Sequence, residues 1–251
     1  MQLTNTAAIV TGGASGLGAA TALALARSGA SVFALDLAAS IEKAPQVEGV
    51  EYIATDVTRP DDVRHAVSIA SAGRPLRTVI NCAGIAPSMR ILGKKGVHDL
   101  GLFATVVQVN LIGSFNVLAI AAEAIAQTEA DEDGQRGVII NTASIAAYEG
   151  QIGQAAYASS KGGIVALTLP AARDLAQYGI RVNTIAPGIV ETPMLATISE
   201  EFRAGLAAGV PFPHRLARPD EYAKLALAMI DHDYLNGETI RMDGALRMAP
   251  R

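Results

Sequence analysis

The chain has 251 residues, of which 50% are hydrophobic and 18% charged, and its formal net charge is −4. This composition excludes disordered and fibrous proteins and indicates a globular chain long enough to bury a large core. The charge balance gives no basic footprint for nucleic acid or for a membrane surface, so a small-molecule partner is expected. Cys82 is the single cysteine, which excludes an intrachain disulfide framework, and four scattered histidines give no reason to expect a metal site.

Seven short apolar or β-branched segments predict strands. They are residues 7–11, 31–35, 51–55, 78–81, 137–142, 181–185 and 238–242. Segments of helical period lie between them, notably 17–29, 59–73, 101–130 and 153–178. This alternation predicts an α/β fold, a doubly wound, Rossmann-like parallel sheet of seven strands with helices on both faces. Because no Pro/Ser-rich linker divides the chain, residues 1–251 are predicted to form a single dinucleotide-binding domain.

The glycine-rich stretch "TGGASGLG" directly follows the first predicted strand and opens a helix with Gly12, Gly16 and Gly18. Glycine lets the backbone approach a pyrophosphate closely, and a helix N-terminus offers free N–H groups and the positive end of its dipole. The GxxxGxG spacing differs from the common GxGxxG fingerprint. Its place between a strand and a helix nevertheless predicts a dinucleotide site.

Acidic residues follow the second and third predicted strands. Asp36 ends the second strand, where a carboxylate can accept hydrogen bonds from an adenosine ribose diol. Neither Ser15 nor Leu37 supplies a cation for a 2′-phosphate, so NAD is favoured over NADP. The alternatives are that Asp36 only ends a strand or caps a turn, and that Asp56, which suits the adenine edge, is only a turn residue.

Three polar side chains suggest chemistry at the same edge of the sheet. "NTAS" closes the fifth strand at Ser144, and "YASSK" places Tyr157 and Lys161 on one face of the following helix. Ligands of such folds lie beyond the carboxyl ends of the strands, so these groups can meet where a nicotinamide would lie. The alternative is a packed tyrosine beside a solvated lysine.

Five motifs in order carry a family resemblance. They are "TGGASGLG", "NCAG" (81–84), "VNLIG" (109–113), the spacing of Ser144, Tyr157 and Lys161, and "IAPGIVETPM" (185–194). With them, nearly the whole chain resembles the short-chain dehydrogenase/reductase family. Residues 134–188, 210–216 and 234–250 and the inserted "LGKKG" loop (92–96) are similar, more narrowly, to the type II 3-hydroxyacyl-CoA dehydrogenases.

The resemblance implies a catalytic set. Tyr157 would be the general acid/base, Ser144 would hydrogen-bond the substrate oxygen, and Lys161 would hold the nicotinamide ribose and lower the Tyr157 pKa. Asn110 would position a water that relays protons to the lysine. The implied NAD-binding residues are Gly12, Ser15, Gly16, Leu17, Gly18, Asp36, Asp56, Val57, Asn81, Cys82, Tyr157, Lys161, Val190 and Thr192.

The implied activity is that of an NAD-dependent oxidoreductase that interconverts (S)-3-hydroxyacyl-CoA and 3-ketoacyl-CoA, with a substrate-binding segment at about residues 190–216. Arg90, Lys94 and Lys95 are candidates for attracting CoA phosphates, or are simply solvated loop cations. Two alternatives stay open, a dehydrogenase of steroid or other secondary alcohols and a non-catalytic NAD-binding scaffold. Val190 and Glu191 depart from the subgroup pattern, so the pocket roof is expected to differ.

The resemblance also implies a homotetramer, with interface elements in residues 101–130 and 153–178 and in the C-terminal "MDGALRMAP". The alternative is that the apolar helical faces at these places are only part of the hydrophobic core. Neither a nucleic acid nor a membrane is an expected partner. Because the N-terminal residues show no leader with a positive flank, the expected location is the cytoplasm.

Overall fold

The computed structural model describes residues 1–94, 96–192 and 200–250, apart from the Phe202 side chain. Its centre is a seven-stranded sheet in the order β3-β2-β1-β4-β7-β8-β9, in which all neighbouring strands pair in parallel. The strands are β1 (Ala7–Thr11), β2 (Ser31–Asp36), β3 (Val50–Ala54), β4 (Leu76–Asn81), β7 (Gly137–Thr142), β8 (Ile180–Pro187) and β9 (Thr239–Met242). The predicted fold class is confirmed.

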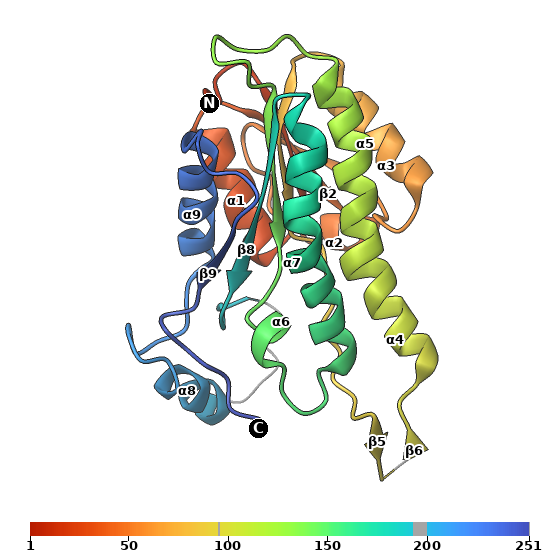
Figure 1. The fold of residues 1–251 in the computed structure, drawn as a ribbon, viewed down its shortest axis with the longest axis vertical. Coiled ribbons are helices and arrows are strands. Elements are labelled where there is room, and N and C mark those ends of the chain that lie inside the picture. Colours follow the sequence, from red (N-terminus) through yellow and green to blue (C-terminus); the bar gives the residue numbers. More distant parts are fainter. Residues whose placement is uncertain (95, 193–199, 251) are drawn as a thin grey trace.

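Helices cover both faces of the sheet (Figure 1). The larger ones are α1 (Gly16–Arg27), α3 (Pro60–Ser71), α5 (Ser114–Ala126), α7 (Ala155–Ala176) and α9 (Pro219–Asp231). Helices α1 and α9 pack together on one face, and α3, α5 and α7 pack on the other. Shorter helices are α2 (Ala38–Ile41), α4 (Leu100–Val107), α6 (Ala146–Glu149) and α8 (Glu200–Ala208).

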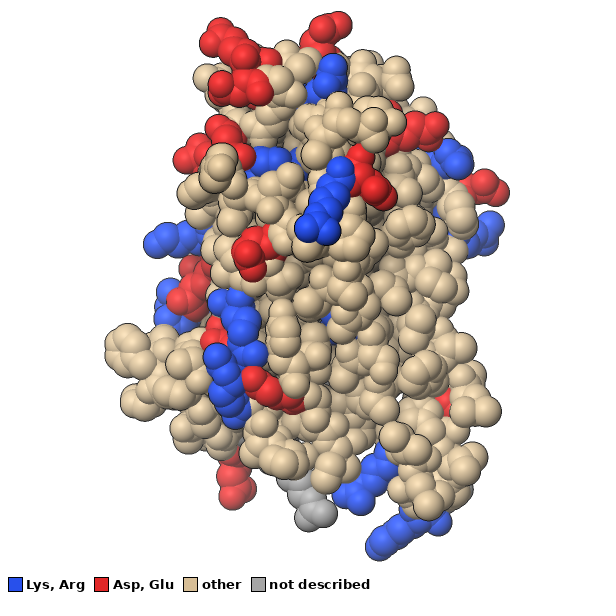
Figure 2. Space-filling model, viewed as in Figure 1, with Lys and Arg blue, Asp and Glu red and all other residues tan. Residues whose placement is uncertain are grey.

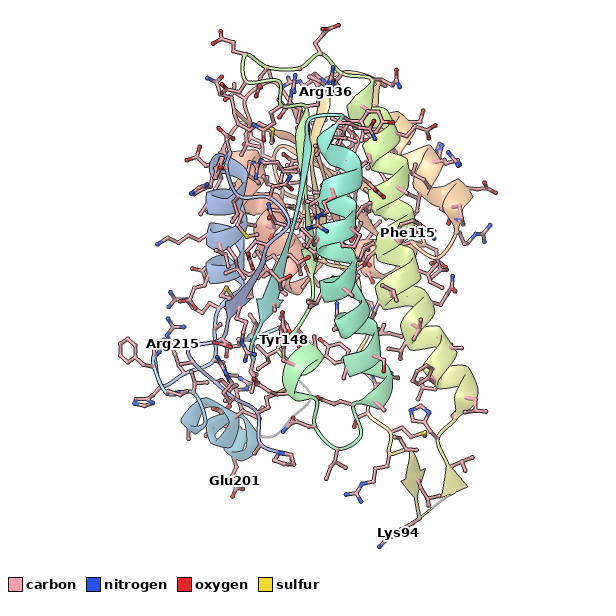
Figure 3. The ribbon with its side chains drawn as sticks, viewed as in Figure 1. Lys94, Phe115, Arg136, Tyr148, Glu201 and Arg215 are labelled. Carbon is pink, nitrogen blue, oxygen red and sulfur yellow. The ribbon has the colours of Figure 1, made fainter. Side chains whose placement is uncertain are left out.

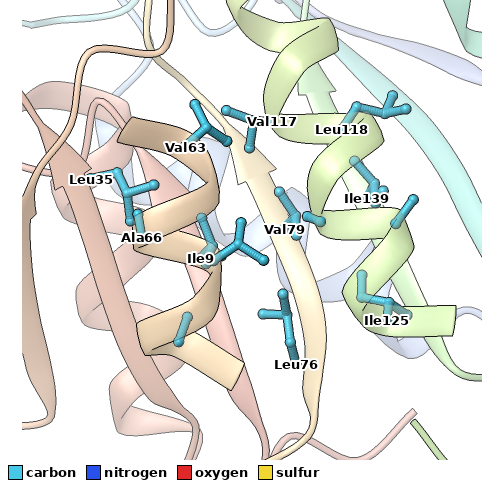
Figure 4. Packing of buried hydrophobic residues seen from close by; sticks show 14 of the residues in the cluster. Ile9, Leu35, Val63, Ala66, Leu76, Val79, Val117, Leu118, Ile125 and Ile139 are labelled. Atoms are coloured by element: carbon cyan, nitrogen blue, oxygen red, sulfur yellow. The ribbon is translucent and has the colours of Figure 1, made fainter. Parts of the chain in front are cut away.

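Two separate apolar clusters hold the layers together. Ile9, Val79 and Ile139 are register partners on three neighbouring strands, and they pack under α3 and α5 against Val63 and Val117 (Figure 4). The next residue along each strand points to the opposite face and joins the cluster under α1 and α9. Burial on both faces explains why these strands are almost continuously hydrophobic.

The stretch 101–130 is not the single regular helix that its periodicity suggests. It consists of α4, a π-helical turn η1 (Gln108–Gly113) and α5. A π-turn inserts an extra residue into the helical ladder and is frequent at functional sites. Here it contains Asn110, whose side chain is fully buried.

A small hairpin that was not predicted, β5 (Leu92–Gly93) with β6 (Gly96–Val97), projects from the end of the molecule where the carboxyl ends of the sheet strands lie (Figure 1). Each strand has only two residues, which is too short for a period-2 pattern to show. The order of the strands reverses direction between β1 and β4. The loops after these strands open the crevice in which ligands of such sheets bind.

Candidate active site

A pocket of about 1070 Å³ runs along this edge of the sheet. The loops after β1, β2, β3, β4, β7 and β8 all contribute to it, so segments far apart in sequence share one cavity. Predicted site residues that line it are Gly12, Ser15, Gly16, Leu17, Gly18, Asp36, Asp56, Val57, Cys82, Ser144, Tyr157, Lys161, Val190 and Thr192.

The glycine loop is built for close backbone approach. Gly12 has φ +64, a conformation that favours glycine, and a Cβ on Gly18 would lie 2.1 Å from the Gly12 carbonyl oxygen. Ser15 occupies the N-cap of α1 in an extended conformation, and among the described residues its side chain makes no capping hydrogen bond. The first N–H groups of α1 are therefore left for an external acceptor, and this cradle fits a pyrophosphate.

The acidic residues sit where an adenosine would be held. Asp36 accepts hydrogen bonds from the N–H of Ala14 at 3.1 Å and of Leu37 at 2.8 Å, which fix its carboxylate at the end of β2. Among the described residues that line the pocket, Lys161 is the only lysine or arginine. A 2′-phosphate beside Asp36 would thus meet like charge, and this end fits NAD rather than NADP.

Asp56 is a turn residue that also lines the pocket, and its contact with an adenine edge stays a prediction. Its Oδ1 accepts from the Thr58 N–H at 2.9 Å and from the Thr58 hydroxyl at 2.7 Å, which is a local turn. The residue also lines the pocket, next to Val57. The turn thus presents this acidic residue to the cavity.

Ser144, Tyr157 and Lys161 meet at the other end of the pocket. Ser144 lies two residues after the end of β7, and its Oγ accepts a hydrogen bond from the Ala146 N–H at 3.1 Å at the start of α6. Tyr157 lies in the first turn of α7, and the Lys161 Nζ lies 5.9 Å from the centre of its ring. The same Nζ donates to the Thr142 carbonyl oxygen at 2.7 Å. One hydroxyl, one phenol and one buried amine therefore face a common space.

The protonation of this pair differs from the sequence-based expectation. Burial raises the pKa of Tyr157 above its ordinary value, and the neighbouring Ser144 hydroxyl acts in the opposite direction. Burial also lowers the pKa of Lys161 to about 8. In the protein without cofactor the pKa of Tyr157 is therefore raised rather than lowered, and desolvation by burial is the largest cause. The lowering of this pKa by Lys161 stays a prediction for the NAD-bound protein.

Asn110 lies behind the pocket wall rather than in its lining. Its Nδ2 donates to the Ile85 carbonyl oxygen at 2.9 Å and to Ser160 Oγ at 3.0 Å, and its Oδ1 accepts from the Ile85 N–H at 2.8 Å. A Cβ on Gly84 would lie 3.1 Å from the Asn110 Oδ1 and 3.6 Å from the Lys161 Nζ. Asn110 thus ties η1 to the loop after β4 near Lys161.

Two further predicted cofactor residues have buried polar surroundings. Asn81 is 2% exposed and does not line the pocket; its side chain donates to Asn141 Oδ1 at 2.9 Å within the sheet. The structure therefore does not support a direct contact between the Asn81 side chain and a cofactor. Cys82 lines the pocket, its Sγ lies 3.7 Å from the Tyr222 hydroxyl, and burial raises the pKa of its thiol.

The predicted substrate segment at residues 190–216 is only partly described. Val190 and Thr192 line the pocket, and Glu191 forms an ion pair with Arg203 at 3.6 Å. Residues 193–199, which include the end of the "IAPGIVETPM" motif, lie outside the described residues, as does Lys95.

Other pocket residues were not predicted from the sequence, among them Ile145, Gln151, Gln154 and Met248. Gln151 and Gln154 stand in the loop before Tyr157, a position that could have suggested them. Met248 comes from the far end of the chain, and no local pattern connects it with Ser144 or Tyr157. The carbonyl oxygen of Thr142 was missed because backbone acceptors have no sequence signal.

The cavity joins a dinucleotide cradle to an acid/base pair, and this geometry defines a class of protein, the dinucleotide-dependent oxidoreductases. A family model described as "short chain dehydrogenase" matches residues 6–202. The chain belongs to the short-chain dehydrogenase family, and its cofactor is NAD.

Individual relatives cover almost the whole chain. A "3-hydroxyacyl-CoA dehydrogenase type-2" of Homo sapiens is 52% identical over 97% of this chain and 95% of the relative. The crystal structure of a 3-hydroxyacyl-CoA dehydrogenase type-2 from Mycobacterium avium has a TM-score of 0.93 and 42% identity, covering 100% of this chain and 99% of that chain. A "(3R)-3-hydroxyacyl-CoA dehydrogenase" of Mus musculus is 34% identical over 99% of this chain and 98% of the relative.

Proposed function

We propose that this protein interconverts (S)-3-hydroxyacyl-CoA and 3-ketoacyl-CoA with NAD. The observation that carries the proposal is the meeting of Ser144, Tyr157 and Lys161 in the pocket that also contains the glycine loop. The substrate class is supported by the names of the relatives that match along almost the whole chain.

Each side chain has a role that follows from its chemistry. The Ser144 hydroxyl hydrogen-bonds the substrate oxygen, and the Tyr157 hydroxyl gives its proton to that oxygen during reduction and takes it back during oxidation. A raised pKa keeps the phenol protonated in the free protein, so it is ready as an acid for ketone reduction. Bound NAD supplies the hydride chemistry.

The two remaining residues support this proton transfer. Lys161 holds the nicotinamide ribose, and a protonated ammonium beside the ring stabilises the phenolate that forms when the Tyr157 proton leaves. Asn110, placed behind the wall and close to Lys161, orients a water for proton relay. Its side-chain hydrogen bonds to Ile85 leave it fixed in position for this role.

Space for a long anionic substrate adjoins the pocket. A second cavity of about 490 Å³ is lined by Arg90, Ile91, Leu92, Gln151, Gln154 and Pro250 among others, and Gln151 and Gln154 line both cavities. Lys94 lies at the tip of the β5–β6 hairpin and points away from the body of the protein (Figure 3). Arg90 and Lys94 are both exposed, which suits attraction of CoA phosphates.

The specificity constants for acetoacetyl-CoA, a ketosteroid and a simple ketone test the substrate class. With NADH in excess, we expect acetoacetyl-CoA to have the highest kcat/KM, and we expect its advantage to shrink at high salt because the attraction of its phosphates by Arg90 and Lys94 is screened. Good turnover of the simple ketone or of the ketosteroid without turnover of acetoacetyl-CoA would refute the acyl-CoA assignment.

A homotetramer is the proposed assembly. The helical run Leu100–Ala126 is long and apolar enough by composition to cross a membrane, yet only 33% of its most apolar stretch is buried. Leu100 is 77% exposed, and Phe115 is 48% exposed and faces outward from α5 (Figure 3). The lower part of the face over α4 and α7 shows few charges (Figure 2). Such a patch favours a subunit interface, which sedimentation velocity tests directly.

A further inference from the structure

Four charged side chains form a closed ring at the end of α6, the short helix that follows Ser144. Arg241 on β9 donates to both carboxylate oxygens of Glu149, at 2.9 and 3.1 Å, and its Nε donates to Asp243 Oδ2 at 2.7 Å. Arg247 closes the ring, because its Nη1 donates to Asp243 Oδ2 at 3.1 Å and its Nε lies 3.3 Å from Glu149 Oε1. Each acid thus contacts both arginines.

Three of the four side chains in the ring are shielded from water more than those of an ordinary surface ion pair, whereas Arg247 is 60% exposed. The side chain of Asp243 is 8% exposed, that of Arg241 22% and that of Glu149 23%, whereas those of the surface pair Arg64 and Glu123 are 61% and 71% exposed. The Arg241 guanidinium also stacks 5.2 Å from the ring centre of Tyr148, which is labelled beside α6 in Figure 3. A bidentate, partly desolvated arginine–carboxylate pair holds its two side chains in one relative position better than an exposed ion pair does.

The ring joins the end of the chain to the helix that follows Ser144. Glu149 is the last residue of α6, and its Oε2 accepts a hydrogen bond from the Met248 N–H at 3.3 Å. Beyond it, Gln151 Nε2 donates to the Ala249 carbonyl oxygen at 3.0 Å, and the Ile152 N–H donates to the Pro250 carbonyl oxygen at 3.0 Å. The C-terminus lies beside α6 and α8 in Figure 1.

This attachment shapes the pocket at its substrate end. Met248 lines the cavity, and Ile145, Val210 and Leu246 form the apolar cluster against which it packs. The glycine loop and Asp36 come from other loops of the sheet and make none of these contacts among the described residues. Loosening the ring should therefore disturb the substrate wall and leave the adenosine end intact.

We propose that Glu149 and Arg241 are positioning residues that hold residues 243–250 as a wall of the substrate pocket and thereby set substrate affinity. They act through Met248 and its neighbours and touch neither the reacting atoms nor the cofactor cradle. The inference rests on the proposed function only for the identity of the substrate.

Glu149→Gln and Arg241→Lys test the role, because each keeps the size of the side chain but removes one charge or the bidentate fork. We expect the KM for acetoacetyl-CoA to rise about three- to tenfold, as when a charge-assisted hydrogen bond is weakened. The KM for NADH should change less than about twofold, and trypsin should cut the NAD-bound variants after Arg247 faster than the wild type. Glu123→Gln, which removes the exposed pair with Arg64, is the matched control and should change none of these values.

An unchanged substrate KM, or equal rises in the KM for substrate and for NADH, would overturn the proposal. Should either variant fail to fold, Arg247→Gln replaces a side chain that is 60% exposed and should give a smaller rise of the substrate KM alone. If the wild type does not reduce acetoacetyl-CoA, the proposed substrate is wrong, and the comparison is made with the ketone that it does reduce. Tryptic cleavage of Glu149→Gln after Arg247 needs no substrate, so it tests the attachment whichever ketone is used.

Discussion

Tyr157→Phe is expected to lower kcat for NADH-dependent ketone reduction by about 10²- to 10⁴-fold, the usual contribution of a positioned general acid. Phenylalanine keeps the ring and the packing of α7 but has no proton to give to the substrate oxygen. The burial of the ring at position 157 and the affinity for NADH should therefore be preserved. Stopped assays of NADH oxidation give kcat, and fluorescence titration gives the NADH affinity.

Tyr178→Phe is the matched control, because Tyr178 follows the opposite end of α7 and lies partly in solvent. It should leave kcat and NADH affinity unchanged. Turnover by Tyr157→Phe at the wild-type rate would refute the acid/base role. Absence of turnover by the wild type with every ketone tested, together with intact NADH binding, would instead favour the non-catalytic scaffold, which otherwise has no use for Ser144, Tyr157 and Lys161 in one pocket.

Lys161→Met is expected to change both activity and the pH dependence of stability. The folded pKa of Lys161 is about 8 and its ordinary value is 10.5, so the unfolded chain binds the proton more tightly. Stability from this group is therefore lowest below pH 8 and rises as pH increases toward 10.5. Between pH 7 and pH 10 the wild-type free energy of unfolding should gain roughly 2 kcal/mol relative to Lys161→Met.

Denaturant unfolding of the cofactor-free proteins at pH 7 and pH 10 measures this difference. Tyr157 and Cys82 have raised pKa values and act in the opposite direction as the pH passes their ordinary values, but both are present in the two proteins, so the difference between the two curves reports the lysine. The same substitution should reduce kcat/KM by at least about tenfold, because the phenolate loses its neighbouring cation. Parallel curves of the free energy of unfolding against pH for the two proteins would contradict a lowered pKa of the buried Lys161.

The sheet and the chemistry of its edge were predictable from local pattern. Strands buried on both faces are continuous apolar runs, as at Ile9 and Ile139, and turns that need glycine carry Gly12 and Gly18. Ser144 and Tyr157 were found because one ends a strand and the other begins a helix. These signals are local, so a single sequence contains them.

Features that depend on distant partners were not predictable in this way. The π-turn at Asn110 interrupts a stretch that has uniform helical period, and the burial that raises the Tyr157 pKa comes from the packing of several loops. Glu149 and Arg241 are 92 residues apart, and each alone resembles an ordinary surface charge. Only the folded chain shows that they share a ring with Asp243.

The configuration of the alcohol substrate tests the proposed function most strictly, since one relative is a (3R)-3-hydroxyacyl-CoA dehydrogenase. The most direct measurement is NAD reduction with (S)- and with (R)-3-hydroxybutyryl-CoA, assayed separately. A pocket in which Ser144 and Tyr157 fix the oxygen should accept one configuration, and we predict turnover of the (S) alcohol at least about 100-fold above that of the (R) alcohol. Preferential turnover of the (R) alcohol, or of neither, would contradict the proposed function.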